Sequence, residues 1–330
     1  MSLSRRRFLE LLGCTTTAVV LPRFLGRSAI PEPIVAALTQ QQRTNNIPVI
    51  WLQGQSCAGC SVSTINAVHP DIAEVLTQTI SLRFHPNVMG GTGDVAVDVL
   101  ERTMKDLPGQ FVLVVEGSIP TAEAGGFCQT GERGGKPVTT ETWVRELGSA
   151  ARAILAVGTC SAFGGIPAAR PNPTGARPVS EILPDATIVN IPGCPSHPDW
   201  VIGTIAHVLL YGLPELDEHL RPTMFFGKAV HEQCERRADF ENGIAATEFG
   251  EEGCLYELGC KGPEAHCDAC IRGWNNKVNW CVRSGSPCIG CTEPDFPDFS
   301  GEGLYVKLPI EKTYGIDWTG PYARKVTAKG

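Results

Sequence analysis

The sequence has little clustered positive charge and, beyond its first residues, no long apolar run. Its 28 lysines and arginines are outnumbered by 35 acidic residues, for a net charge of −7. Phosphate binding needs basic clusters, so we expect no nucleic-acid partner. A membrane helix needs roughly 20 apolar residues, which predicts no membrane span in this chain. The 330 residues also contain no internal repeat or low-complexity tract, and this length favours two domains.

The first residues resemble an export signal. Three arginines and Phe-Leu at residues 4–9 precede a short apolar stretch, residues 11–21. The stretch is too short to cross a bilayer, and its combination with the arginines resembles a twin-arginine signal. We expect residues 1–46 to be signal peptide and leader, and the protein to reach the periplasm already folded. A basic leader without a targeting role is the alternative.

Short apolar runs alternate with amphipathic stretches in the first two thirds of the chain. The runs, typical of strands covered on both faces, are residues 48–52, 111–115, 153–157 and 187–191. The stretches between them that look helical include residues 62–78, 96–107 and 140–151. This alternation predicts an α/β fold with a doubly wound parallel sheet.

Cysteines follow the ends of three of these runs. Cys57 and Cys60 come after the first, Cys160 after the third and Cys194 after the fourth, each in a turn rich in glycine or proline. Open α/β sheets bind ligands beyond the carboxyl ends of their strands, so these four thiols are predicted to share one crevice.

From about residue 221 the chain is rich in cysteine, glycine, proline and tryptophan, with few periodic stretches. We therefore predict a domain of residues 47–220 and a smaller, irregular domain of residues 221–330 that is held together largely by its cofactors. Eleven of the fourteen cysteines and one histidine then form three sets of four. The sets are Cys57, Cys60, Cys160 and Cys194; His231, Cys234, Cys254 and Cys260; and Cys270, Cys281, Cys288 and Cys291.

Three such sets favour three iron–sulfur clusters and hence an electron-transfer function. Thiolates are soft ligands that hold iron in tetrahedral geometry, with four per cubane. A C-x-x-C pair alone is more often a zinc site or a redox disulfide than an iron–sulfur site, and an exported protein can use a disulfide framework instead. A non-enzymatic protein stabilised by zinc or disulfides is therefore the alternative. Cys14 lies in the leader, and Cys128, outside every set, is expected to be a buried thiol.

Five motifs resemble those of nickel–iron hydrogenase small subunits. They are WLQGQSCAGCS at residues 51–61, VGTC at 157–160, IPGCP at 191–195, LGCKGP at 258–263 and PCIGC at 287–291. The resemblance covers essentially the whole chain after the leader. It implies a flavodoxin-like domain and a heterodimer with a large subunit that carries the nickel–iron site, so that this chain holds no catalytic residue. A quinone-reductase-type iron–sulfur module shares the first domain but lacks the two further sets and the export signal.

The resemblance also orders the three sets. It implies a proximal [4Fe-4S] cluster on the Cys57 set, a medial cluster on the Cys281 set and a distal [4Fe-4S] cluster, with a histidine ligand, on the His231 set. Electrons from H2 would pass along them to an external acceptor. Because the chain ends at Gly330 without the membrane helix of membrane-bound relatives, we expect a periplasmic acceptor such as a cytochrome c. Ser56 and Glu116, beside the proximal set, either face the large subunit or are ordinary polar turn residues.

The medial set departs from the commonest family pattern. Proline usually stands where this chain has Cys281, and a fourth cysteine there resembles the nickel–iron–selenium branch. We therefore expect a medial [4Fe-4S] cluster, with [3Fe-4S] as the alternative. The family's remaining cysteine would fall at Ala269, so Cys270 is the expected ligand and Cys267 its substitute. Gly59 stands where oxygen-tolerant relatives carry an additional cysteine, so we expect no six-cysteine proximal cluster.

Overall fold

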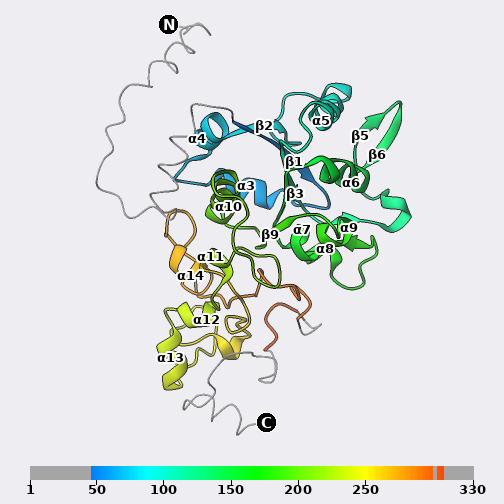
Figure 1. The fold of residues 1–330 in the computed structure, drawn as a ribbon. Helices are drawn as coiled ribbons and strands as arrows, with labels where there is room; N and C mark the ends of the chain where they lie inside the picture. The colour runs from blue at the N-terminus through cyan, green and yellow to red at the C-terminus, as the bar shows by residue number, and fades with distance from the viewer. Residues whose placement is uncertain (1–45, 300–302, 308–330) are drawn as a thin grey trace, which may run out of the picture.

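The computed structural model describes residues 46–299 and 303–307. Its centre is a five-stranded parallel sheet in the order β2-β1-β3-β7-β9 (Figure 1). Counted along the chain, this is the 2-1-3-4-5 order of flavodoxin-like folds. The strands are β1 Ile47–Gln53, β2 Ile80–Phe84, β3 Val112–Glu116, β7 Ala153–Val157 and β9 Ile188–Ile191. The predicted α/β class and parallel sheet are confirmed, whereas the export signal lies outside the described residues.

The four predicted strands form, and a fifth was not predicted. β2 pairs with β1 at the edge of the sheet, and its central residues are only partly buried. It therefore lacks the continuous apolar run that identifies the inner strands. The predicted helices near residues 96–107 and 140–151 are α5 Asp94–Asp106 and α6 Thr140–Ala150.

The predicted helix over residues 62–78 is divided into separate pieces. The structure has α3 Gly59–Ile65, then α4 Ile72–Glu74 and the π-helical turn η2 Val75–Thr79. Pro70 stands between them, and proline has no N–H group and clashes with the preceding helical turn. Asp71 then caps α4 by accepting a hydrogen bond from the Glu74 amide at 2.8 Å.

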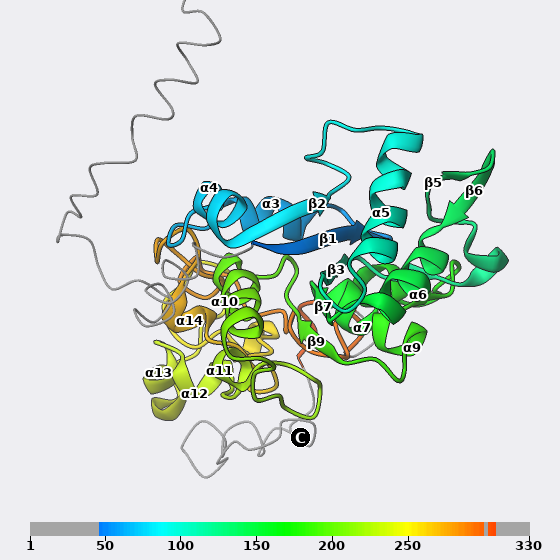
Figure 2. The same cartoon turned by 45° about the horizontal axis from the view of Figure 1, so that its top comes forward.

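Alternate residues of each strand serve two separate cores. Val114 and Leu155 pack on the face covered by α3 and α10 Pro198–Leu210, while Leu113 and Ile154 pack on the face covered by α5 and α6 (Figure 2). This follows from the two-residue period of a strand. Two small antiparallel pairs extend the second side: β4 Ile119–Pro120 with β8 Ala176–Arg177, and the hairpin β5 Gln129–Arg133 with β6 Lys136–Thr139.

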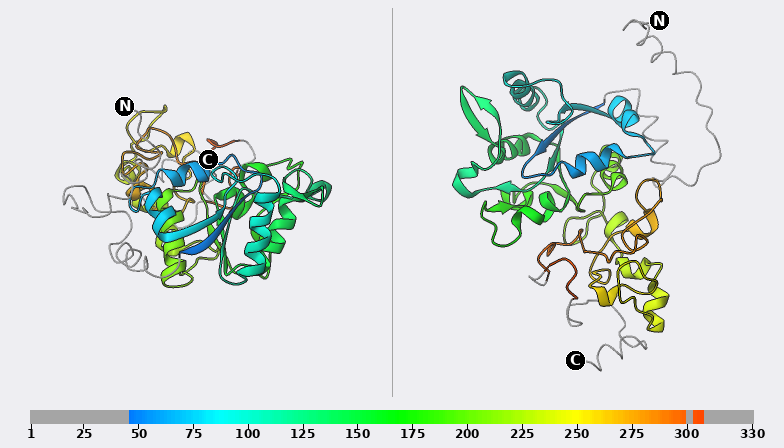
Figure 3. Two further views of the ribbon diagram at one scale, coloured as in Figure 1. Left: turned by 90° about the horizontal axis from the view of Figure 1, so that it is seen from above. Right: turned by 180° about the vertical axis from the view of Figure 1, so that it is seen from behind.

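Short helices fill the loops of the sheet and make up most of the regular structure after it. The first group is η3 Ala122–Gly125, α7 Thr159–Phe163, α8 Gly165–Ala168 and α9 Val179–Ile182. The second is α11 Thr223–Phe226, α12 Val230–Gln233, α13 Arg237–Asn242, η4 Tyr256–Leu258 and α14 Ala269–Arg272. This second group lies beside the sheet at one end of the molecule (Figures 1 and 3). Among the described residues, none of the helices combines the length and apolar character needed to span a bilayer.

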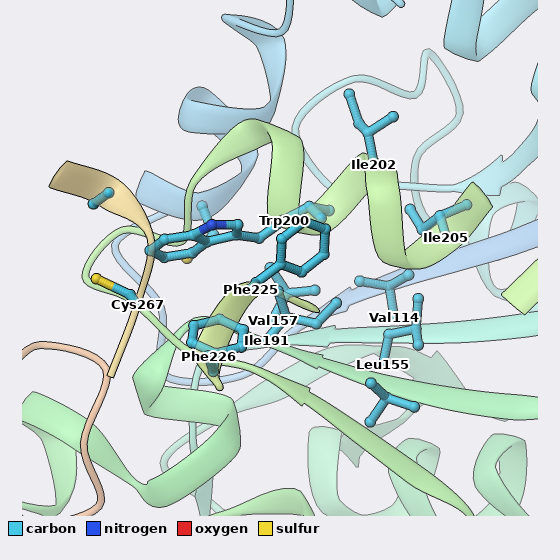
Figure 4. Packing of buried hydrophobic residues seen from close by; sticks show 14 of the residues in the cluster. Val114, Leu155, Val157, Ile191, Trp200, Ile202, Ile205, Phe225, Phe226 and Cys267 are labelled. Carbon is cyan, nitrogen blue, oxygen red and sulfur yellow. The ribbon is translucent and has the colours of Figure 1, made fainter. Parts of the chain in front are cut away.

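The α10 core continues from the sheet into the later part of the chain. Trp200 of α10 packs against Phe225 and Phe226 of α11, and Cys267 lies at the edge of this cluster (Figure 4). The Trp200 indole N–H donates to Asp268 at 2.7 Å. Arg272 is paired with Asp268 and, at 3.2 Å, with Asp199 of α10. The predicted boundary between domains, near residue 220, stays a prediction, because these contacts join both sides of it.

A buried ion network ties together three segments after β9. Arg221 is 3% exposed, and its guanidinium donates to Asp217 at 2.7 Å and to Glu293 at 2.9 Å. Glu293 also accepts a hydrogen bond from the His266 amide at 2.6 Å. Burial alone would raise the pKa of Glu293, but the hydrogen bonds from His266 and the charge of Arg221 outweigh it and keep the pKa below its ordinary value.

Candidate functional site: three groups of thiols

The thiols of the first set lie near one another beyond the carboxyl ends of the strands. Cys57 and Cys60 lie between β1 and the first turn of α3, Cys160 lies in α7 after β7, and Cys194 follows β9. The pKa of Cys160 is raised to about 12, mainly by burial and in part by the charges of Cys194 and Cys57. Burial likewise raises the pKa of Cys60, together with the charges of Glu116 and of neighbouring thiols of the set. The predicted convergence of these four cysteines therefore occurs.

Glycines leave room around these sulfurs. A Cβ atom on Gly158 would lie 2.5 Å from the Cys60 sulfur, and one on Gly59 would lie 3.0 Å from the Cys57 sulfur. Gly158 also has a φ of +84°, which L-residues rarely adopt. The Ser196 amide points at the Cys60 sulfur at 3.4 Å. Space beside the thiols and amide hydrogens directed at them are what a large anionic cluster needs.

Glu116 organises the turn that carries Cys57 and Cys60. It is 2% exposed and accepts hydrogen bonds from Trp51 at 2.9 Å, from Ser56 at 3.0 Å and from the Cys60 amide at 3.1 Å. The Ser61 hydroxyl, which also contacts His85 at 3.1 Å, is a further donor. A carboxylate held this way fixes the turn from inside, which supports the interpretation of Glu116 as a polar residue of the turn; that it faces the large subunit stays a prediction.

The second set surrounds a hollow near α12. His231 lies in α12, Cys234 at its end, and Cys254 and Cys260 on either side of η4. These four side chains line one hollow, which is partly open to solvent. Burial lowers the pKa of His231, so its imidazole is neutral and available to bind a metal. Amides of Arg236 and Cys288 point at the sulfurs of Cys234 and Cys260, at 3.4 and 3.3 Å.

Three cysteines of the third set lie between the other two sets. Burial raises the pKa of Cys288 well above its ordinary value, and the charges of Cys260, Cys267, Cys281 and Cys291 raise it further. Burial raises the pKa of Cys291 to about 12, with Cys281 as the strongest charged neighbour. Cys194 of the first set is also close to Cys291, since its amide lowers that pKa and its charge raises it.

Cys270, the expected fourth member, has a different neighbour. Burial raises its pKa to about 12, and the largest charge acting on it is that of Cys234, in the second set. Cys267 is instead near Cys291, whose charge is the largest that adds to burial in raising the pKa of Cys267. The structure thus brings Cys281, Cys288 and Cys291 together and places Cys267 beside them.

The arrangement suits clusters better than single ions. All thirteen cysteines that the structure describes are free thiols, and nowhere in residues 46–299 and 303–307 do three or more His, Cys, Asp or Glu side chains converge closely enough for one metal ion. A tetrahedral zinc needs all its sulfurs about 2.3 Å from one point. A cubane spreads its thiolates over four separate irons, so its ligands stand farther apart. The grouped thiols, the space that glycines leave beside them and the amides that point at their sulfurs fit iron–sulfur clusters.

Sequence reasoning missed two buried charged groups beside the thiols. Lys261 is 0% exposed, and its ammonium donates to the carbonyl oxygens of Gly259 at 2.8 Å and Leu304 at 3.2 Å. The Arg221 network likewise holds Glu293, two residues after Cys291. A lysine next to a cysteine or an arginine in a loop carries no sequence signal of burial, so neither could have been found from the pattern alone.

The fold and these groups of thiols define an iron–sulfur electron-transfer protein. The family formed by the C-terminal domain of the NiFe/NiFeSe hydrogenase small subunit matches residues 226–302, and the family of the NADH ubiquinone oxidoreductase 20 Kd subunit matches residues 57–208. The periplasmic [NiFeSe] hydrogenase small subunit of Desulfomicrobium baculatum is 46% identical over 315 residues, 90% of this chain and 97% of that protein. The hydrogenase-2 small chain of Escherichia coli K12 is 39% identical over 330 residues, 98% of this chain and 83% of that one.

Solved structures agree with these relatives. A reduced, active form of the Ni-Fe-Se hydrogenase from Desulfomicrobium baculatum matches with a TM-score of 0.77 at 46% identity, over 80% of this chain and 100% of that one. The recombinant [NiFeSe] hydrogenase of Desulfovibrio vulgaris Hildenborough matches with a TM-score of 0.76 at 43% identity, over 80% and 99%. This chain belongs to the nickel–iron hydrogenase small-subunit family. It is the electron-transferring subunit of a hydrogenase heterodimer whose large subunit is catalytic, and its cofactors are iron–sulfur clusters.

Proposed function

We propose that this chain carries electrons between the large subunit and an external acceptor through three clusters in the order proximal, medial, distal. The main support for this proposal is that each group of thiols lies next to another. Cys194 of the first set lies near Cys291 of the third, and the Cys288 amide of the third set contacts the Cys260 sulfur of the second at 3.3 Å. These contacts support the third set as the middle one, which is the order that the family resemblance implies. Clusters bound there supply one-electron redox chemistry.

The proposed ligand sets are those of the sequence motifs, and the neighbours of each thiol in the structure support them. Cys57, Cys60, Cys160 and Cys194 are proposed to hold a proximal [4Fe-4S] cluster, and His231, Cys234, Cys254 and Cys260 a distal one. The medial [4Fe-4S] cluster has Cys281, Cys288 and Cys291, with Cys270 or its substitute Cys267 as the fourth thiol. A fourth thiol at Cys281 supports a cluster of four irons rather than three. Burial is the largest cause of the raised pKa of Cys288 and Cys291, and the charge of Cys281 also raises both. For Cys288, the charges of Cys260 and Cys267 have larger effects than that of Cys281.

Iron analysis and H2 reduction test this proposal directly. The anaerobically purified heterodimer is expected to contain about twelve cluster irons in the small subunit, four for each cubane. Under H2 its visible cluster absorption should bleach and return when an oxidant is added. Zinc or disulfides absorb no visible light, so a colourless small subunit would refute the proposal, and a count near four would favour a single-cluster, quinone-reductase-type module.

The external acceptor is proposed to be a cytochrome c in the periplasm. Relatives from Desulfomicrobium baculatum and Solidesulfovibrio fructosivorans are named periplasmic, which supports that location. His231 is half-buried beside a hollow that is partly open to solvent, which supports a distal cluster near a surface where an acceptor can dock.

Twin-arginine export is the proposed route to that location. Replacing Arg5 and Arg6 together by lysine keeps the charge but removes the guanidinium pair. We expect the variant to accumulate in the cytoplasm with its clusters assembled, as measured by fractionation and immunoblotting. Replacing Arg23 and Arg27 by lysine is the matched control and should leave export at the wild-type level. Export of the Arg5/Arg6 variant at that level would contradict the proposed signal.

A further inference from the structure

The sequence leaves two candidates for the fourth medial ligand, because the family position falls at Ala269 and cysteines flank it on both sides. Cys267 lies in the loop before α14, and Cys270 lies within α14. Both side chains are buried, at 7% exposure each, so burial does not choose between them. The choice between them depends on the contacts of the two segments that carry them.

The loop that leads to Cys267 is bound to α12, where the Val230 amide donates to the Ala265 carbonyl at 2.7 Å, and also to the segment that carries Cys288 and Cys291. The Lys261 amide donates to the Cys288 carbonyl at 2.7 Å, and the His266 amide donates to the Glu293 carboxylate at 2.6 Å. A Cβ atom on Gly290 would also lie 3.1 Å from the Lys261 Cβ, so the two backbones run side by side. Cys267 directly follows His266 and is therefore delivered to the medial group.

The helix that carries Cys270 is held by α12 and α10. Its helix α14 packs on α12, the helix that ends at Cys234 of the distal set. Arg272 anchors α14 through Asp268 and, at 3.2 Å, through Asp199 of α10. The Trp200 indole N–H donates to the same Asp268 at 2.7 Å, so α14 is held against α10 as well as against α12.

We propose that Cys267, and not Cys270, completes the medial cluster with Cys281, Cys288 and Cys291, and that Cys270 stays a free buried thiol between the medial and distal sets. This inference rests on the proposed three-cluster function. It reverses the preference drawn from the sequence, where Cys270 is one residue from the family position and Cys267 is two.

The test compares Cys267→Ala and Cys270→Ala in the purified heterodimer. Cys267→Ala is expected to lose about one of about twelve irons and to show, when oxidised, the electron paramagnetic resonance signal of a [3Fe-4S] cluster. Cys270→Ala should keep the wild-type iron content and lack that signal. Cys281→Pro, which removes a thiol shared by both versions of the medial set, is the positive control and should behave like Cys267→Ala.

The outcomes separate the ligand question from the proposed function. A [3Fe-4S] signal in Cys270→Ala, or wild-type iron in Cys267→Ala, would overturn the inference while the three clusters of the wild type stand. A wild-type heterodimer with fewer than three clusters would refute the proposed function itself. Cys267→Ser preserves the size of the side chain and is expected to give the same iron loss, with wild-type circular dichroism and recovery with the large subunit, which excludes misfolding as the cause.

Discussion

Replacing Arg221 by methionine is expected to destabilise the small subunit by about 3–5 kcal/mol, the usual cost of removing one partner from a buried ion pair. Methionine keeps the volume and the apolar stem but leaves Glu293, whose side chain is 8% exposed, without its cation. Asp217 and the Thr292 carbonyl lose the same donor. Because Glu293 also holds His266, the medial cluster should be released before the other two.

The loss of stability in Arg221→Met should become smaller as the pH falls. The folded-state pKa of Glu293 is depressed in the wild type, so its contribution to stability is present above the ordinary value of 4.5 and is lost as the pH falls through the folded value. The difference between wild type and Arg221→Met is therefore largest at neutral pH and narrows in acid. Urea unfolding of the anaerobic complex, followed by visible absorption at several pH values, measures it.

Arg102→Met is the matched control for this experiment. Arg102 pairs with Asp98 at 2.9 Å on the surface of α5, with side-chain exposures of 74% and 52%. An exposed pair of this kind contributes about 0–1 kcal/mol. Equal urea midpoints for the Arg221 and Arg102 variants would show that the buried network does not support the medial region.

The sequence predicted the sheet and the proximal set because both follow from strong, simple patterns. Short apolar runs such as residues 111–115, bounded by turn residues, are typical of a doubly covered strand, and the carboxyl ends of parallel strands meet at one edge. This is why Cys60 and Cys160 could be placed together across 100 residues of sequence. The edge strand β2 was missed because its partial burial leaves no continuous apolar run. The break at Pro70 was missed because the apolar residues keep a helical spacing on both sides of it.

The later part of the chain was much harder to predict. Its order comes from cross-links such as Lys261 to Cys288 and Arg221 to Glu293, which join residues without any periodic pattern. Membership of the distal set followed from spacing and family resemblance, but the choice between Cys267 and Cys270 depends on which backbone amide is bound to which partner. The sequence does not contain these hydrogen-bond partners, and a shift of one residue in a loop is enough to move a thiol from one set toward another.

Replacing Cys57 and Cys60 together by alanine is expected to disconnect the large subunit from the rest of the chain. Both thiols of the C-x-x-C turn are lost, and Cys160 and Cys194 alone cannot retain a cubane that needs four ligands. H2-dependent reduction of an added dye or cytochrome should fall to less than about one hundredth of the wild-type rate. This corresponds to an increase of at least about 2.7 kcal/mol in the apparent activation free energy. Exchange of D2 with water protons should persist, because it moves no net electrons out of the large subunit.

The two readouts together locate the defect. If exchange is lost as well, the turn is needed for assembly of the heterodimer, and recovery of the large subunit with the variant would reveal this. Cys128→Ala is the matched control, because Cys128 lies outside every set and its sulfur accepts a hydrogen bond from the Thr140 hydroxyl at 3.1 Å. This substitution should leave both rates at the wild-type level. Dye reduction that survives the double substitution would mean that electrons leave by a route that bypasses the strand ends, and the order of transfer argued from Cys194 and Cys291 would then be wrong.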